Sequence, residues 1–87
     1  MSDQPTTRDL YKAKAITDEE VRAAVDAYMA DPATSLFAIT ERYSLDLAGA
    51  VRSHAWAQQT VSNADATEYL KRTAVCTAIL LARPENR

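Results

Sequence analysis

At 87 residues the chain is long enough for one domain and too short for two. Its formal net charge of −2 and isoelectric point near 5.2 exclude bulk electrostatic attraction to nucleic acid or to an anionic membrane. One glycine and three prolines are too few for the turns of a many-stranded β fold, and the many alanines favour helices. We therefore expect an all-α fold, a small helical bundle of four to five helices forming a single domain over residues 1–87.

Several kinds of site and location are not expected. The N-terminal fifteen residues lack the apolar core of a secretory signal, and the longest apolar stretch, residues 75–82, is far shorter than the roughly 20 residues that span a bilayer. Cys76 and His54 are the only cysteine and the only histidine, whereas a zinc ion needs about four ligands. We expect Cys76 to be a buried free thiol in a reduced, cytoplasmic protein with no cofactor and no small-molecule substrate.

The N-terminal third contains the firmest local signal. Residues 1–7 are polar and expected to be disordered, and residues 8–14 are locally basic, forming either a short helix or an extended arm. Thr17 and Glu20 form a capping box, which predicts a helix over 18–30. Its apolar residues recur at spacings of three and four, and Asp31 before Pro32 ends it.

Two further helices are predicted in the middle of the chain. One begins near Thr34 or Ser35 and carries an apolar stripe of Leu36, Ile39 and Tyr43. After a short turn at 44–46, capped by Ser44 or Asp46, the other runs from Leu47 to about Val61. Its pattern leaves two alternatives open: Trp56 belongs to the core, which its large indole favours, or it is exposed for a partner. His54 on this helix is interpreted as a hydrogen-bonded packing residue.

The last predicted helix spans residues 64–83 and stops at Pro84. Its second half has almost no polar face, and a helix that is apolar all round must be buried all round. Because the other helices are short, we expect a homodimer to cover it. Leu70, Ile79 and Leu81 are assigned to this interface or to a core that the two copies share, and Trp56 is assigned to the interface.

Residues 31–56, DPATSLFAITERYSLDLAGAVRSHAW, resemble the helix-turn-helix of homeodomain-like modules. They are also similar to the N-terminal domains of phage small terminase subunits and of small phage or plasmid regulators, in which a stretch of the form DP-x-x-S-L-x-x-I-x-x-R-Y leads into a turn and a recognition helix. With the helix at 18–30, the resemblance implies a trihelical unit over residues 18–61. It also implies that the second helix of the motif enters the major groove of DNA.

The resemblance assigns DNA contacts to particular side chains. Arg52 is the base reader, because its guanidinium can bind two acceptors on guanine, and Ser53 and Gln59 are weaker candidates. Thr34, Ser35 and Arg42 would contact phosphates. The basic segment would reach along the minor groove as an arm through Arg8, Lys12 and Lys14. A plain helical hairpin with no role in DNA binding is the alternative.

No set of residues suggests catalysis. The chain has no glycine-rich phosphate loop, and on a helix the adjacent Ser53 and His54 would point about 100° apart. The sequence therefore predicts a non-enzymatic, DNA-binding regulator or packaging-type protein of phage type, dimeric through its last helix. The alternative is a protein-interaction module, such as an adaptor, inhibitor or antitoxin-like subunit, that binds through a face of Trp56, Phe37 and Leu36 with mixed charge.

Overall fold

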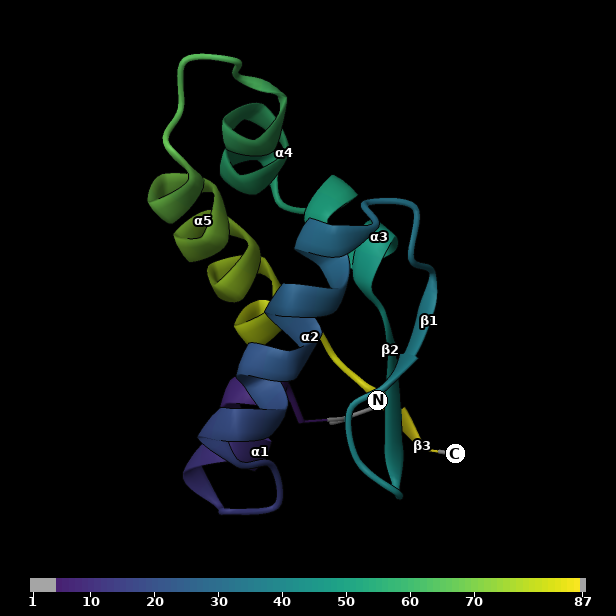
Figure 1. Cartoon of the computed structure of the whole chain (residues 1–87). Helices are drawn as coiled ribbons and strands as arrows, with labels where there is room; N and C mark the ends of the chain where they lie inside the picture. The colour runs from purple at the N-terminus through teal and green to yellow at the C-terminus, as the bar shows by residue number, and fades with distance from the viewer. Residues whose placement is uncertain (1–4, 87) are drawn as a thin grey trace.

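A computed structural model describes residues 5–86 as five helices and three short strands (Figure 1). The helices are α1 (Thr7–Lys12), α2 (Asp18–Ala30), α3 (Leu47–Arg52), α4 (Ala55–Ser62) and α5 (Glu68–Leu81). The strands are β1 (Leu36–Ala38), β2 (Tyr43–Asp46) and β3 (Glu85–Asn86), which form an antiparallel sheet in the order β1-β2-β3. The small helical domain is confirmed, but the chain is not purely all-α.

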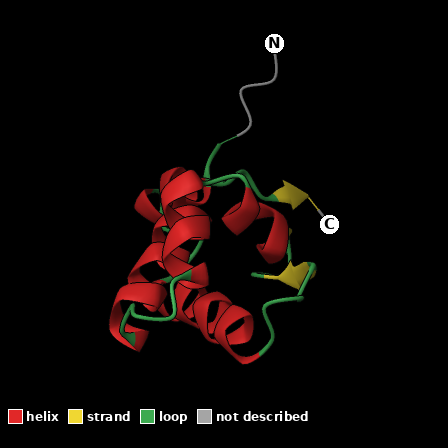
Figure 2. Cartoon of the chain, turned by 90° about the horizontal axis from the view of Figure 1, so that it is seen from above, coloured by secondary structure: helices red, strands yellow, loops and turns green. Residues whose placement is uncertain are grey.

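The helices make up most of the molecule and the sheet lies to one side of them (Figure 2). The longest helix, α5, packs against α1, α2, α3 and α4. Its inward positions are completely or almost completely buried: Ala74, Val75, Ala78 and Ile79. The monomer therefore covers much of the apolar surface that the sequence assigned to a dimer. Cys76 is only partly buried, so the expectation of a fully buried thiol is wrong.

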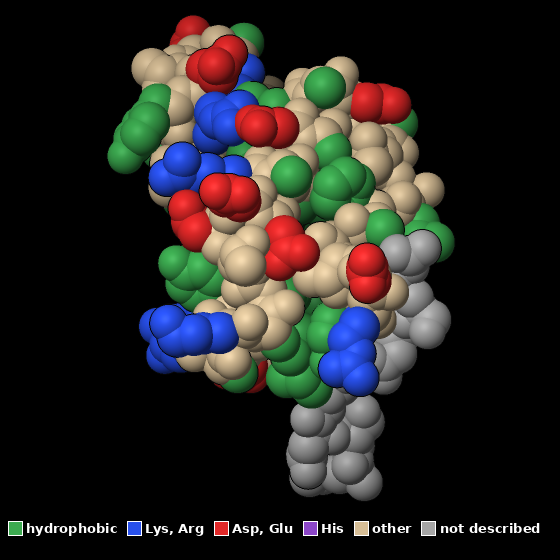
Figure 3. Space-filling model, turned by 60° about the horizontal axis from the view of Figure 1, so that its bottom comes forward, with side chains coloured by type: hydrophobic (Ala, Val, Ile, Leu, Met, Phe, Trp, Pro, Cys, Tyr) green, Lys and Arg blue, Asp and Glu red, His purple; other side chains and the backbone are tan. Residues whose placement is uncertain are grey.

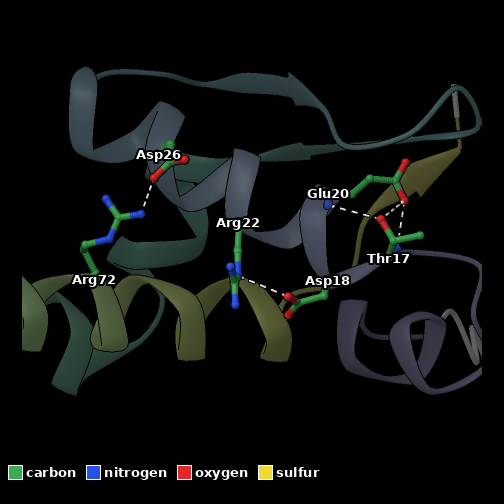
Figure 4. A network of polar contacts seen from close by, with 6 residues as sticks. All are labelled: Thr17, Asp18, Glu20, Arg22, Asp26 and Arg72. Atoms are coloured by element: carbon green, nitrogen blue, oxygen red, sulfur yellow. Dashed lines mark hydrogen bonds and ion pairs between the residues drawn. The ribbon is translucent and has the colours of Figure 1, made fainter.

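The helix predicted over 18–30 is confirmed as α2. The Glu20 N–H donates to the Thr17 hydroxyl at 3.2 Å, and the Thr17 N–H donates to the Glu20 carboxylate at 2.8 Å (Figure 4). This reciprocal pair satisfies two backbone donors at the helix start. Asp31 has an extended backbone and ends the helix, as expected before Pro32.

The basic segment forms a helix, α1, rather than an extended arm. Thr7 is completely buried, and both its N–H and its hydroxyl donate to the carbonyl of Ala82, at 2.8 and 3.2 Å. Leu10 joins the core one turn later. The disorder predicted for residues 1–7 is therefore wrong for residues 5–7, and for residues 1–4 it lies outside the described residues.

The helix predicted from Thr34 or Ser35 to Tyr43 is wrong, because this segment forms the β1–β2 hairpin. The Thr40 hydroxyl accepts from the N–H groups of Arg42 and Tyr43, each at 3.0 Å, and so stabilises the turn. The first helix of the predicted helix-turn-helix is therefore absent, and a β-hairpin occupies these residues instead.

The helix predicted over 47–61 forms two helices, because the helical conformation is interrupted at Ser53 and His54. Asp46 caps α3 as expected, accepting from the Gly49 N–H at 2.9 Å. His54 has an extended backbone and caps α4. The break changes the angular phase of the helix, so Val51 on α3 and Ala57 on α4 can both face the core. The break is consistent with the ambiguity of the sequence pattern, which left two positions open for Trp56.

The position of Trp56 and the start of the last helix also differ from the predictions. Trp56 is 44% exposed, so the favoured core position is wrong and the exposed alternative is confirmed. The last helix begins after Thr67, whose hydroxyl accepts from the Leu70 N–H at 3.1 Å, and not after Asn63. Asn63 instead ends α4, and its side chain accepts from the Asp65 N–H in the following turn.

Candidate interaction groove

A groove of about 630 Å³ lies between the hairpin, α3 and the segment that follows α5. Three stretches of chain that are distant in sequence meet there. The lining residues are Leu36, Ser44, Leu45, Asp46, Gly49, Ala50, Ser53, His54, Leu81, Ala82, Arg83 and Glu85. Aliphatic side chains and polar or charged side chains therefore contribute to the groove in similar proportion.

Strand alternation gives the hairpin its groove-facing side. Leu36 pairs with Asp46 and Phe37 pairs with Leu45, so successive side chains point to opposite faces of the sheet. Phe37 and Leu45 pack into the core, whereas Leu36 and Asp46 lie on the outer face. The outer face is thus where the hairpin contributes to the groove.

Backbone hydrogen bonds fix α3 against the start of the hairpin. The Leu47 N–H donates to the Ser35 carbonyl at 2.8 Å, and the Ala48 N–H donates to the Thr34 carbonyl at 3.0 Å. These bonds satisfy two of the N–H groups that a helix start leaves without intrahelical partners. Thr34 and Ser35 therefore lie in a loop beside α3 and do not begin a helix that could bind phosphate.

Two leucines keep much of their apolar surface in water at this groove. Leu36 is 69% exposed and Leu81, at the end of α5, is 50% exposed. Both line the same hollow, so each presents apolar surface to the same solvent-filled space. Phe37, which the interaction alternative also named, packs against the core and is not part of this surface.

The charges around the groove have both signs. Asp46 and Glu85 are acidic and Arg83 is basic. Arg83 also acts on Asp9 in α1: hydrogen bonds from the Thr6 backbone and side chain lower the pKa of the Asp9 carboxyl, and Lys12 and Arg83 lower it further. Arg83 is therefore shared between the groove and α1.

The predicted base reader lies far from the predicted arm. Arg52 ends α3 beside Tyr28, in the C-terminal half of α2: burial raises the pKa of the Tyr28 hydroxyl, and the Arg52 charge opposes this rise. Lys14 precedes the start of α2, which has 13 residues. A helix of that length extends about 20 Å. Arg52 is therefore separated from the basic residues of α1 by most of the length of α2.

The other predicted DNA-contacting residues are also dispersed. Ser53 lies at the end of α3 and lines the groove, while Gln59 is exposed on α4. Arg42 is exposed in the hairpin turn, which lies at the same end of the molecule as α1 (Figure 1). Arg8 and Lys12 are exposed on α1. The structure thus brings the α1 cations and Arg42 to one end and leaves Arg52, Ser53 and Gln59 elsewhere.

Acidic side chains accompany many of the cations. Lys and Arg side chains are interspersed with Asp and Glu on the face at the α1 end (Figure 3). Arg22 Nε lies 3.1 Å from the Asp18 carboxylate, and Arg72 on α5 pairs with Asp26 on α2 (Figure 4). Exposed pairs of this kind contribute little to stability, but they neutralise charge that a polyanion would need.

The predicted dimer residues divide into two groups. Leu70 is 42% exposed, and Leu81 and Trp56 are similarly accessible. Ile79 is completely buried within the monomer, so it lies in the core and not on the surface that a second copy could contact. It occupies the inward face of α5, where α1, α2, α3 and α4 already cover the helix.

Within residues 5–86 we find no group of three or more His, Cys, Asp and Glu side chains arranged to hold a metal ion. In the same part of the chain, no helix combines the length and apolarity needed to cross a membrane. No protein-family model, curated protein or solved structure matches the chain.

Proposed function

We propose that the chain is a non-enzymatic protein-interaction module that binds a partner protein in the groove between the hairpin, α3 and the end of α5. The observation that carries the proposal is the pair of solvent-exposed leucines, Leu36 and Leu81, in one hollow. Burying them against a partner removes apolar surface from water, which is worth about 25 cal/mol per Å². An aliphatic or aromatic side chain of the partner is the complementary anchor.

Charge supports a polypeptide partner with a basic residue next to that anchor. Asp46 and Glu85 line the groove, and the third charged residue, Arg83, also faces the acidic Asp9. A lysine or arginine beside the apolar anchor would meet the two carboxylates. A polyanion would face the same two carboxylates and be repelled, so nucleic acid is the poorer occupant of this groove.

The test begins with the selection of peptides that bind the full chain from a displayed random library. A selected peptide is then labelled, and its affinity is measured by fluorescence anisotropy for the wild type and for Leu36→Asp and Leu81→Asp. Tyr69→Asp is the matched control, because Tyr69 is an exposed apolar residue of α5 that lies outside the groove and is not assigned to the dimer. Circular dichroism establishes that each variant is folded.

We expect the selected peptides to share an apolar residue next to a lysine or arginine. The groove variants should bind at least about tenfold more weakly, since a central anchor contributes 1.4 kcal/mol or more. The control should bind within about twofold of the wild type. Failure to enrich any peptide, or equal affinity for the wild type and both groove variants, would overturn the proposal.

A homodimer belongs to the same proposal as a second mode of association. With Ile79 in the core, the dimer would depend on Leu70, Leu81 and Trp56. Sedimentation of the chain at tens of micromolar tests this directly. A dimer mass that Leu70→Asp reduces to the monomer mass supports the assignment, and a monomer mass for the wild type refutes it.

DNA binding is the second candidate function, and the observation that favours it is the set of exposed cations at the α1 end. Arg8, Lys12 and Lys14 follow one another along a short segment, and Arg42 in the hairpin turn lies at the same end of the molecule. In this version, α1 contacts phosphates and Arg52 does not take part in the same footprint.

Titration of random duplex DNA at about 50 mM salt tests this second function, because electrostatic attraction is generous at low salt. If DNA binds, Lys12→Ala or Lys14→Ala should reduce the salt dependence by about one unit each, and the affinity should fall equally for all sequences. Because Arg52 lies outside this footprint, Arg52→Ala should leave the affinity unchanged; a cost of about 1–3 kcal/mol at one base pair would instead support the predicted base-reading role of Arg52. Absence of binding at this salt concentration removes the DNA function.

A further inference from the structure

We propose that His54 makes the start of α4 sensitive to acid: protonation of its imidazole removes the N-cap of α4 and loosens the wall of the groove that this residue forms. The opening of the first turn of α4 is a conformational change within the chain. It rests on the geometry of the cap and requires no partner.

The cap depends on the neutral form of the ring. The Ala57 N–H donates to Nδ1 of His54, with 3.2 Å between the two nitrogens. A ring nitrogen can accept this bond only through its lone pair, so Nδ1 carries no proton and the proton of the neutral ring lies on Nε2. The imidazole therefore plays the part that a serine, threonine or aspartate oxygen plays at most helix starts.

Protonation reverses this interaction. The added proton occupies the Nδ1 lone pair, so two N–H groups then point toward each other and the hydrogen bond is lost. The imidazolium also places a positive charge at the positive end of the α4 dipole, which is unfavourable. Both effects act in the same direction and favour opening of the first turn of α4.

α4 depends on its cap and on its packing against α5 and α3. It has eight residues, with no acidic residue in its first turn and no basic residue in its last. A helix this short is marginal without tertiary support, and only Ala57 and Thr60 of α4 are buried. The other four helices are capped by oxygens, from Thr6, Thr17, Asp46 and Thr67. Caps of these types remain acceptors between about pH 5 and pH 8, so the response is specific to α4.

The charged groups that face His54 have both signs. Across the groove, Asp46 from β2 and Glu85 from β3 favour the imidazolium, while Arg83 in the segment between α5 and β3 disfavours it. Arg52 lies two residues before His54 at the end of α3. None of these groups replaces Nδ1 as the acceptor of the Ala57 N–H.

Two signals report on the cap. Trp56 is the only tryptophan, and its ring centroid lies 6.2 Å from that of His54 in an edge-to-face arrangement, so its emission reports on the contact. Hydrogen exchange reports on the helix itself. The Ala57 N–H loses its acceptor directly, and the Gln58 N–H, which donates to the His54 carbonyl at 2.9 Å, is freed only if the first turn opens.

The test compares the wild type with His54→Asn and His54→Ala between pH 8 and pH 5. Asparagine keeps a cap acceptor that does not titrate in this range, whereas alanine removes the acceptor at every pH. After correction for intrinsic exchange rates, protection of Gln58 in the wild type should fall about fivefold on acidification, the effect of losing an average N-cap. Protection should stay high in the asparagine variant and low in the alanine variant at both pH values.

Equal protection of Gln58 in the wild type at pH 8 and pH 5 would overturn the proposal. A fall of the same size in His54→Asn would also overturn it, because another group would then be responsible. These outcomes are independent of peptide binding, so the cap proposal and the groove proposal can fail separately.

Discussion

Removal of a single methylene from Ile79 is expected to destabilise the domain measurably. Ile79 is completely buried on the inward face of α5. The Ile79→Val substitution loses the transfer free energy of one methylene, about 0.8 kcal/mol, plus a small cavity term, so we expect a cost of about 1 kcal/mol. For a chain of this size that corresponds to a decrease in Tm of about 4–8 °C. Larger deletions are less useful, because the whole domain is stable by only about 4–13 kcal/mol.

Leu81→Val is the matched control, because it also removes one methylene from α5. Leu81 is 50% exposed, so the transfer cost falls to about 0.4 kcal/mol and no closed cavity forms. Urea unfolding followed by circular dichroism measures both free energies, and equal m-values establish that the comparison is valid. An equal loss of unfolding free energy at the two positions, or a larger loss at Leu81, would show that Ile79 does not lie on the inward face of α5.

Three further results are expected. Burial raises the pKa of the Cys76 thiol, and the charge of Asp18 adds to the effect. Mass spectrometry should therefore find that the native protein is alkylated at neutral pH much more slowly than the protein in urea, and equal rates would contradict this. Burial also raises the pKa of the Tyr28 hydroxyl, so the folded state holds the protons of Tyr28 and Cys76 more tightly than the unfolded state does. The contribution of these two groups to the free energy of unfolding should be fully present below about pH 9 and should be lost as the pH rises through the raised values. Cys76→Ser should make this decline shallower. Thr17→Ala should cost about 1 kcal/mol in urea unfolding through loss of the α2 capping box, whereas Thr73→Ala on the exposed side of α5 should cost less than about 0.5 kcal/mol, and equal costs would argue against the cap.

Local chemistry predicted α2 correctly because every determinant of that helix lies within it. Thr17 and Glu20 satisfy its first donors, the apolar residues recur at helical spacing, and Pro32 follows its end. Asp46 was similarly recognisable as a cap, because an aspartate side chain directly before a helical run accepts from the N–H three residues later.

The hairpin was missed because two periodicities overlap in residues 36–45. Leu36, Ile39 and Tyr43 fit a helical stripe, and the prediction followed that spacing. Phe37 and Leu45, together with Ile39 and Tyr43, also fit an alternating pattern, and these are the residues that pack toward the core. Packing against other elements decides between the helical and the extended conformation, and the local sequence holds no information about that packing.

The break between α3 and α4 was missed for a different reason. His54 is an uncommon cap, and no glycine or proline accompanies it, so the sequence carries no conventional stop signal there. The ambiguous pattern of the predicted helix over 47–61, which left both a core and an exposed position open for Trp56, was the available indication.

The groove could not be predicted from the sequence, because its walls come from three distant stretches of chain. Leu36 was recognised as a candidate for a partner-binding face and Leu81 as an interface residue. Their meeting in one hollow depends on the hairpin and on the direction of the chain after α5. Asp46 was recognised only as a helix cap and Glu85 was not singled out, since single acidic residues are common on protein surfaces.

Chemical-shift mapping of the ¹⁵N-labelled chain with a selected peptide tests the proposed function most directly. We expect the largest amide shifts at the groove, in Leu36, Asp46, Ser53 and Glu85, and we expect them to disappear in Leu81→Asp. Shifts concentrated instead on α1, or unchanged by the Leu81→Asp substitution, would contradict the groove as the binding site.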